Sequence, residues 1–283
     1  LVSRVERLER ISLTAEQALE NSSGLPAAEI ERRSNELIAL RDASWSLRND
    51  RIHNANMVLD LAGADATTSA RNAYFTIQQS FAAIDRMEVR GRDSAGVNVL
   101  VWGHEIEASD NRVVPLLAGR TDDPLFTSRS VRVGSATRAW SFVYKAAAEI
   151  GELGDNTRVM RDAVRSDDLL RLLVSQPGAR VSVIGHTRWA SVGIISEPNA
   201  HPVNSEEVGA AAGAPYLVAA LNGDVDNHAE ITLRRSLKIA EPITTDAKVI
   251  PTAVSRLISG GSSLEEAFRT TVSEFEGSVA IAA

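Results

Sequence analysis

Apolar residues at helical spacing dominate the first sixty positions of the chain. Two stretches carry this pattern, at Val5, Leu8 and Leu19 and then at Ile30, Leu37, Leu40 and Leu47. Spacings of three, four and seven residues put the apolar side chains on one face of a helix. The run Asn-Ser-Ser-Gly-Leu-Pro at residues 21–26 is typical of a turn. The pattern therefore predicts an antiparallel helical hairpin, and a membrane-active or coiled-coil role fits it less economically.

A third helix and a strand are predicted next. After Gly63 the helical pattern returns over residues 66–89, with its apolar face at Tyr74, Ile77, Phe81 and Ile84. From Ala95 to Trp102 the chain becomes rich in Val and other apolar residues, which predicts a strand. The Pro, Gly and Asp residues between Pro115 and Pro124 predict a loop.

The remaining half mixes predicted helices and strands. Helical spacing joins Trp140, Val143, Tyr144, Ala147 and Ile150, and then Val159, Ala163, Leu170 and Leu173. Short apolar runs at 181–184 and 216–221 predict buried strands, each followed by polar residues, and the run at 278–283 predicts a last strand. Helices and strands do not alternate as regular βαβ units. We therefore predict an α+β fold rather than a doubly wound sheet.

Composition narrows the class of protein. The 283 residues have a formal net charge of −7 and scattered Lys and Arg, which argues against nucleic-acid binding. No run approaches the roughly 18 apolar residues of a membrane span, and no signal peptide is recognisable, so we expect a cytoplasmic protein without membrane contact. The absence of cysteine excludes disulfides, thiolate metal sites and cysteine catalysis by these residues.

Candidate chemistry lies in polar clusters beside the predicted strands. The clusters are Arg-Gly-Arg-Asp-Ser-Ala-Gly at 90–96, His-Thr-Arg-Trp-Ala-Ser-Val-Gly at 186–193, Ser-Glu-Pro-Asn-Ala-His-Pro at 196–202, Leu-Asn-Gly-Asp-Val-Asp-Asn-His at 221–228 and Thr-Thr-Asp at 244–246. An Arg can clamp a carboxylate, an Asp can hold an ammonium group, and Asn-Gly can donate to an oxyanion. Together they fit an amino acid with a reacting carbonyl. No phosphate-binding loop occurs, and the five histidines lack metal-site spacing, so we expect no metal and no cofactor.

These motifs, in this order, resemble the class II glutamine amidotransferases of the glutamine-fructose-6-phosphate aminotransferase type. The resemblance covers about residues 74–283, and Trp189 with the Asn-Ala-His-Pro run at 199–202 separates it from amidophosphoribosyltransferases. It implies a four-layer αββα sandwich of the N-terminal-nucleophile hydrolases. The implied organisation is a helical hairpin insertion at residues 1–66 and a glutaminase domain at 67–283, incomplete at both ends.

The resemblance also implies roles for individual residues. Asn222 and Gly223 would stabilise the oxyanion, and Arg188 would bind the α-carboxylate of L-glutamine. Asp246 would hold its α-ammonium group, Ser191 would bind glutamine at the position where the family usually has Thr, and Trp189 would belong to the loop that closes over the ligand. Arg90 and His186 would support the site, with His186 and Ser94 as hydrogen-bonded structural residues. Ammonia would pass to a sugar-phosphate isomerase domain of the same polypeptide, outside this chain, to make glucosamine 6-phosphate in a homo-oligomer.

The main departure from the family is the missing N-terminal cysteine nucleophile, which leaves this chain inactive by itself. The start at Leu1 and the end at Ala283 within an apolar run lead us to expect a trimmed segment. The alternatives are an amidotransferase with another ammonia acceptor and a non-catalytic module that binds glutamine or mediates assembly.

Each site residue also has a structural interpretation. Arg188 could pair with a local carboxylate, Asp246 could cap a helix that starts at Ala247, Asn222-Gly223 could form a turn, and Trp189 could pack in the core or at its rim. The functional interpretation therefore depends on the set as a whole.

Overall fold

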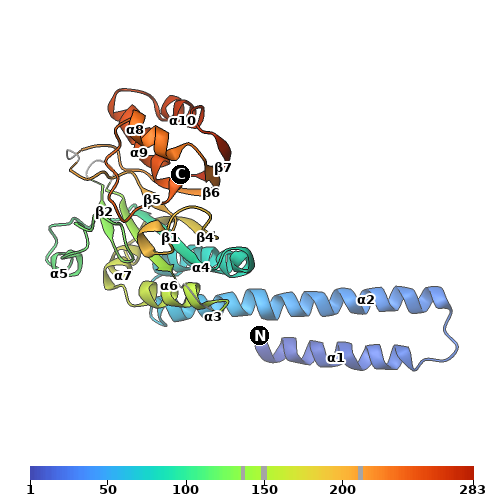
Figure 1. Ribbon diagram of the computed structural model, residues 1–283. Coiled ribbons are helices and arrows are strands. Elements are labelled where there is room, and N and C mark those ends of the chain that lie inside the picture. The colour runs from blue at the N-terminus through green and yellow to red at the C-terminus, as the bar shows by residue number, and fades with distance from the viewer. Residues whose placement is uncertain (135–137, 148–151, 210–212) are drawn as a thin grey trace. The chain divides into compact units, whose positions relative to one another are not determined.

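The computed structural model describes residues 1–134, 138–147, 152–209 and 213–283, and of Arg90 only the backbone. Internal contacts divide the chain into two units, Leu1–Asp60 and Leu61–Ala283. In Figure 1 the first unit is the blue helical segment, and the second contains both sheets and the remaining helices. No helix in the described ranges is both long and apolar enough to cross a membrane.

The first unit consists of helices. Helix α1 (Val2–Glu20) and helix α2 (Ala27–Ser46) run antiparallel, and α2 continues through the π-helical turn η1 (Leu47–Ile52) into α3 (His53–Ala62), which crosses into the second unit. Two ion pairs define the pairing, Glu9 with Arg48 at 2.8 Å and Glu16 with Arg41 at 3.6 Å. The side-chain amide of Asn21 donates to the carbonyl of Gln17 and ends α1 where the sequence predicts a turn.

The first sheet of the second unit is antiparallel, in the order β2-β3-β1-β4. Its strands are β1 (Ser94–Trp102), β2 (Val131–Val133), β3 (Trp140–Ala147) and β4 (Arg180–Arg188). The predicted strand at 95–102 is confirmed as β1. The predicted burial of residues 181–184 is wrong in degree, because β4 is an edge strand and Val181, Val183 and Ile184 are half-buried.

The predicted helix over residues 140–147 is wrong, since this segment is strand β3. Trp140, Phe142 and Tyr144 alternate along it and are buried, and the intervening residues Ser141 and Val143 are buried too. A strand buried on both faces has no polar alternation, so its apolar run also fits helical spacing. Ile150, which the same prediction includes, lies outside the described residues.

The second sheet is smaller and also antiparallel, in the order β5-β6-β7. Its strands are β5 (Val203–Asn204), β6 (Val218–Val225) and β7 (Gly277–Ala282). Leu221 and Val225 of β6 share an apolar core with Val249 and Ile250 of helix α9 (Val249–Ser259). The predicted strands at 216–221 and 278–283 therefore exist, with bounds shifted toward the C-terminus in the first case.

Helices cover one face of the first sheet. Helix α4 (Thr68–Met87) buries Tyr74, Ile77, Phe81 and Ile84 as predicted, contacts β4, and begins where the Thr67 hydroxyl accepts from the Ala70 amide. The opposite face approaches the segment before β5 so closely that a Cβ at Gly96 would lie 2.3 Å from the His201 carbonyl oxygen. The remaining helical elements are η2 (Glu88–Arg90), α5 (Val114–Leu117), α6 (Asp155–Arg165), α7 (Asp168–Val174), η3 (Glu197–Asn199), α8 (His228–Arg234), η4 (Asp246–Lys248) and α10 (Leu264–Val272). The mixture of helices and antiparallel sheets is compatible with the predicted α+β class.

Candidate functional site

The predicted site residues meet at one cavity of about 840 Å³. Its walls come from the end of α4, the end of β4 with the following loop, the middle of β6, and the first residue of η4. Among the lining residues are His186, Arg188, Trp189, Ser191, Asn222, Gly223 and Asp246. Of the predicted set, only the side chain of Arg90 lies outside the described residues. Residues up to 160 positions apart in sequence, from Arg86 to Asp246, thus face a common space.

Arg188 provides a buried positive charge in the cavity wall. It is the last residue of β4, lies opposite Ser94 of β1, and is 4% exposed. Its guanidinium donates to the carbonyl oxygens of Val192 and Ile194, so its hydrogen bonds go to the following loop and not to a local carboxylate. Burial lowers the pKa of Arg188, while the nearby carboxylates of Asp246 and Asp93 act in the opposite direction.

Asp246 provides a buried negative charge in the same cavity. One of its carboxylate oxygens accepts from the Val225 amide of β6 at 2.7 Å. The interpretation of Asp246 as a helix cap is wrong, because η4 already includes Asp246 and its carboxylate is bonded to the sheet. The preceding loop is held by the Asn199 side-chain oxygen, which accepts from the amides of Thr244 and Thr245 at 2.7 and 2.9 Å.

Asn222 and Gly223 lie inside strand β6, so the interpretation of this pair as a turn is wrong. They lie opposite Ala280 and Val279 of β7. Gly223 has φ of +126°, and a Cβ there would lie 1.8 Å from the Ser278 carbonyl oxygen, so only glycine fits. The Asn222 side chain is exposed at the cavity.

The loop after β4 forms a rim of the cavity. Trp189 is 73% exposed, so the alternative that it packs in the core is wrong. The amide of Ala190 donates to the Asp93 carboxylate at 2.8 Å, and the Ser191 hydroxyl donates to the carboxylate of Asp224. Asp224 also lines the cavity. It belongs to the polar cluster at 221–228, but no role was predicted for it, because no local pattern distinguishes it from an ordinary polar strand residue.

Two histidines of the cavity wall lie in contact, with ring centroids of His186 and His201 4.8 Å apart. His201 bonds the Leu221 carbonyl through Nδ1 at 3.1 Å and the Thr245 hydroxyl through Nε2 at 3.0 Å. The expectation that Ser94 and His186 are hydrogen-bonded is confirmed in part. His186 has a hydrogen bond with the Leu221 backbone, whereas Ser94 Oγ and His186 Nδ1 are buried without a partner among the described residues. Burial and the charge of Arg188 lower the pKa of His186 to about 4. Burial likewise holds the pKa of His201 well below its usual value, so both rings are neutral at pH 7.

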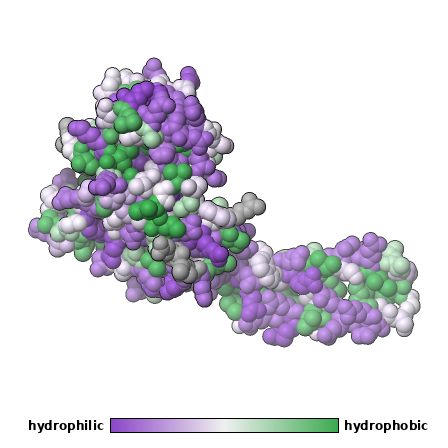
Figure 2. Space-filling model, viewed as in Figure 1, coloured by the Kyte–Doolittle hydropathy of each residue, from purple (hydrophilic) through white to green (hydrophobic). Residues whose placement is uncertain are grey.

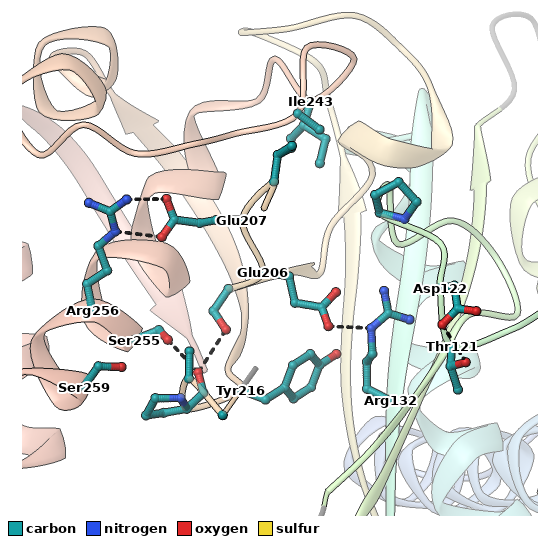
Figure 3. A pocket seen from close by; sticks show the side chains of 17 residues that line it. Thr121, Asp122, Arg132, Glu206, Glu207, Tyr216, Ile243, Ser255, Arg256 and Ser259 are labelled. Atoms are coloured by element: carbon teal, nitrogen blue, oxygen red, sulfur yellow. Dashed lines mark hydrogen bonds and ion pairs between the residues drawn. The ribbon is translucent and has the colours of Figure 1, made fainter. Parts of the chain in front are cut away.

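A second cavity of about 350 Å³ is lined by ion pairs that belong to the fold. Figure 3 shows Arg132 directed at Glu206 and Arg256 directed at Glu207. The distances are 2.6 Å for the first pair and 2.7 Å for each bond of the bidentate second pair. Each arginine of this cavity is already paired with a carboxylate, whereas Arg188 is bonded, among the described residues, only to backbone carbonyls. The cavity at Arg188 is therefore the better candidate for binding a charged ligand. Within the described ranges no group of His, Asp and Glu is arranged to hold a metal ion.

Comparison with known proteins finds similarity in sequence. No protein-family model matches the chain. The chain is 38% identical over 124 residues to a glutamine–fructose-6-phosphate aminotransferase [isomerizing] from Geobacillus kaustophilus. The matched segment covers 44% of the chain and 19% of that protein. Proteins of the same name from Halalkalibacterium halodurans and Bacillus subtilis are 35% and 34% identical over 40% and 44% of the chain. These matches cover 18% and 19% of the two proteins, so the similarity concerns about a fifth of each relative.

Proposed function

We propose that the second unit is the glutamine-binding domain of a class II glutamine amidotransferase. The observation that carries the proposal is the convergence of Arg188, Asp246 and the Asn222–Gly223 pair on one cavity. The opposite charges of Arg188 and Asp246 and the hydrogen-bond donors of Asn222 and Gly223 match an α-amino acid with a side-chain carbonyl. The similarity to glutamine–fructose-6-phosphate aminotransferases supports glutamine as that amino acid.

Each group of glutamine has a partner in this arrangement. Arg188 binds the α-carboxylate and Asp246 binds the α-ammonium group, which requires the Arg188 guanidinium to exchange its loop carbonyls for the ligand. The side-chain amide oxygen points to the Asn222 side chain and the Gly223 amide. Trp189 and Ser191 lie on the loop that covers the bound amino acid.

Hydrolysis requires a nucleophile that residues 1–283 do not contain, because the chain has no cysteine. In the proposed reaction a thiolate attacks the side-chain carbonyl carbon, and Asn222 and Gly223 stabilise the negative oxygen. Ammonia leaves with a proton, and water then cleaves the thioester to give glutamate. The proposal assigns the thiol to an N-terminal cysteine outside these residues, as in the family that the motifs resemble.

The contacts of the second unit support a four-layer arrangement of this domain. Helix α4 contacts β4 on one face of the first sheet, His201 approaches Gly96 on the other face, and α9 packs on β6. We extend the proposal to residues 67–283 as the glutaminase domain and to the hairpin as an insertion. The names of the relatives point to fructose 6-phosphate as the ammonia acceptor, in a sugar-phosphate isomerase domain of a homo-oligomeric enzyme.

A second candidate function is a glutamine-binding module without hydrolysis. The absence of cysteine favours it, because the binding groups are present and the nucleophile is not. Binding is common to both candidates, and only the release of ammonia and glutamate separates them.

The binding role is tested on the 283-residue protein by isothermal titration with L-glutamine. Asp246→Asn keeps the acceptor for the Val225 amide but removes the charge that holds the ammonium group. A charge-assisted hydrogen bond contributes about 1.5–3 kcal/mol, so we expect affinity to fall about 10- to 100-fold. Glu241→Gln, an exposed carboxylate five residues earlier, is the control and should leave affinity unchanged. Equal affinities for both variants would refute the ammonium contact.

The hydrolytic role is tested on the mature polypeptide isolated from its natural source, by sequencing its first residues and measuring glutamate release. An N-terminal cysteine and glutamine-dependent release of ammonia are expected. Asn222→Ala in that polypeptide should lower turnover by about 10²–10³ with little change in KM, because its donor acts on charge formed in the transition state. A mature protein that binds glutamine without releasing ammonia would establish the non-catalytic alternative.

A further inference from the structure

The helical hairpin of the first unit has a polar seam and an apolar flank. Its helices bury few side chains, which are Val5, Ser12 and Ser44 within the paired segments of α1 and α2. The Ser12 hydroxyl is buried without a hydrogen-bond partner among the described residues. Large apolar residues lie beside the seam instead, and Figure 2 shows hydrophobic side chains reaching the surface along the hairpin. Because mostly serines are buried between the two helices, their packing against each other contributes little hydrophobic stabilisation.

The apolar flank forms a groove along one face of the hairpin. Ala15, Ala18 and Leu19 of α1 line it with Leu37 and Leu40 of α2, together with Ser22, Leu25, Arg33 and Glu36. Leu8 and Ile11 continue this stripe at spacings of three and four residues toward the start of α1, and they are 42% and 51% exposed. The groove therefore runs over much of the hairpin length and leaves Leu8, Ile11 and Leu40 in contact with solvent.

Charge divides the hairpin into two ends of opposite sign. The Glu9–Arg48 and Glu16–Arg41 ion pairs show which residues of α1 lie beside which residues of α2. The loop end, residues 12–45, has six acidic and three basic side chains, for a net charge of −3. The open end, residues 1–11 and 46–56, has five basic and three acidic side chains, for a net charge of +2. A second hairpin in the antiparallel direction would place each loop end on an open end, whereas a parallel one would oppose like charges.

We propose that two copies of this chain associate through their hairpins into an antiparallel four-helix bundle, with the groove of each hairpin buried against the other. Helices of this length span about 28 Å, and a face two helices wide covers about 550 Å². The pair would bury about 1,100 Å² in total, which exceeds the roughly 1,000 Å² expected of a biological interface. The bundle buries Leu8, Ile11 and Leu40, which the hairpin alone leaves exposed. It would link two second units independently of any chemistry at the Arg188 cavity.

The groove is tested by sedimentation equilibrium of the 283-residue protein. The wild-type chain is expected to be a dimer in concentration-dependent equilibrium with monomer. Ile11→Glu and Leu40→Glu place charges in the buried groove and should raise the dimer Kd about 100-fold or more. Leu13→Glu, at a 56% exposed position of α1 outside the groove, is the matched control and should leave Kd unchanged. Circular dichroism checks that all variants keep their helices.

Charge reversal tests the antiparallel pairing of the two ends. Glu20→Arg with Glu31→Arg changes the loop end to +1, and Arg7→Glu with Arg10→Glu changes the open end to −2. Each pair alone opposes like charges and should weaken the dimer, while the four changes together should restore it. A chain that stays monomeric up to its solubility limit overturns the proposal. Dimers insensitive to Ile11→Glu, or no rescue in the fourfold variant, overturn it as well.

Discussion

The His186 side chain makes the folding stability depend on pH. Burial lowers its pKa to about 4, against a usual value near 6.5 in an unfolded chain. As the pH falls below about 6.5, the unfolded state binds the proton first, so folding stability is lost progressively down to about pH 4. Above pH 6.5 the ring is neutral in both states and stability no longer depends on it.

We expect this group to remove about 1–3 kcal/mol of unfolding free energy between pH 7 and pH 4. Urea unfolding of the 283-residue protein at a series of pH values measures the slope. His186→Gln should flatten the slope, and His201 should account for part of what remains, because its pKa is lowered too. His53→Gln, an exposed histidine of α3, is the control. Identical slopes for His186→Gln and the wild type would contradict the assignment.

Single glycines determine how closely the backbone segments of the site approach. Gly96 of β1 allows the His201 carbonyl to reach the sheet, and Gly223 allows β6 to lie against Ser278. Both positions occur in motifs that suggested chemistry from the sequence. Their structural reason is the space around the Cα atom, which lets the segment before β5 approach the first sheet at Gly96 and lets β6 approach β7 at Gly223.

At the scale of elements, Asp167 joins three segments of the second unit. Its buried carboxylate accepts from Arg120, from the Tyr144 hydroxyl at 2.8 Å, and from the Leu169 and Leu170 amides at the start of α7, both at 3.1 Å. Burial acts to raise the pKa of Asp167, but the hydrogen bonds and charge of Arg120 prevail and lower it. The carboxylate thus caps α7 and anchors β3 through Tyr144.

Asp167→Asn leaves the charge of Arg120 without its partner in a largely buried site. Breaking a buried pair on one side costs about 3–5 kcal/mol, and we expect a loss near the lower value because Asn retains the helix cap. Asp168→Asn, an exposed neighbour, should change unfolding free energy by less than about 0.5 kcal/mol. Chemical denaturation of both variants measures the difference, and equal stabilities would show that the network contributes nothing.

At the scale of the whole molecule, the sequence predicted elements best where each has one buried face. Helix α4 shows this, since Tyr74, Ile77, Phe81 and Ile84 repeat with the helical period and are all buried. The prediction failed for β3, which lies inside the first sheet and is buried on both faces, Lys145 included. Local spacing cannot separate a helix from a strand when neither face contacts water.

For the candidate site, too, the sequence predicted some features and the tertiary structure decided others. Short motifs identified Arg188, Trp189, Asn222, Gly223 and Asp246 as a set, because their side chains suit an amino acid ligand. Which wall each residue occupies was decided by partners far away in the chain. Asp246 faces the cavity because Asn199 and Val225 hold its loop, and the two histidines meet because both approach Leu221.

The sequence by itself therefore determined the helical hairpin pattern, most helices, the mixed class of the fold and the chemical character of the candidate site. These follow from periodicity and from side-chain types, which are local properties. Only the tertiary structure decided that residues 140–147 form a strand, that Asn222 and Gly223 lie within β6, and that the buried charges of Arg188 and Asp246 share one cavity. Those outcomes depend on strand register and close backbone contacts between distant segments, which no local pattern specifies.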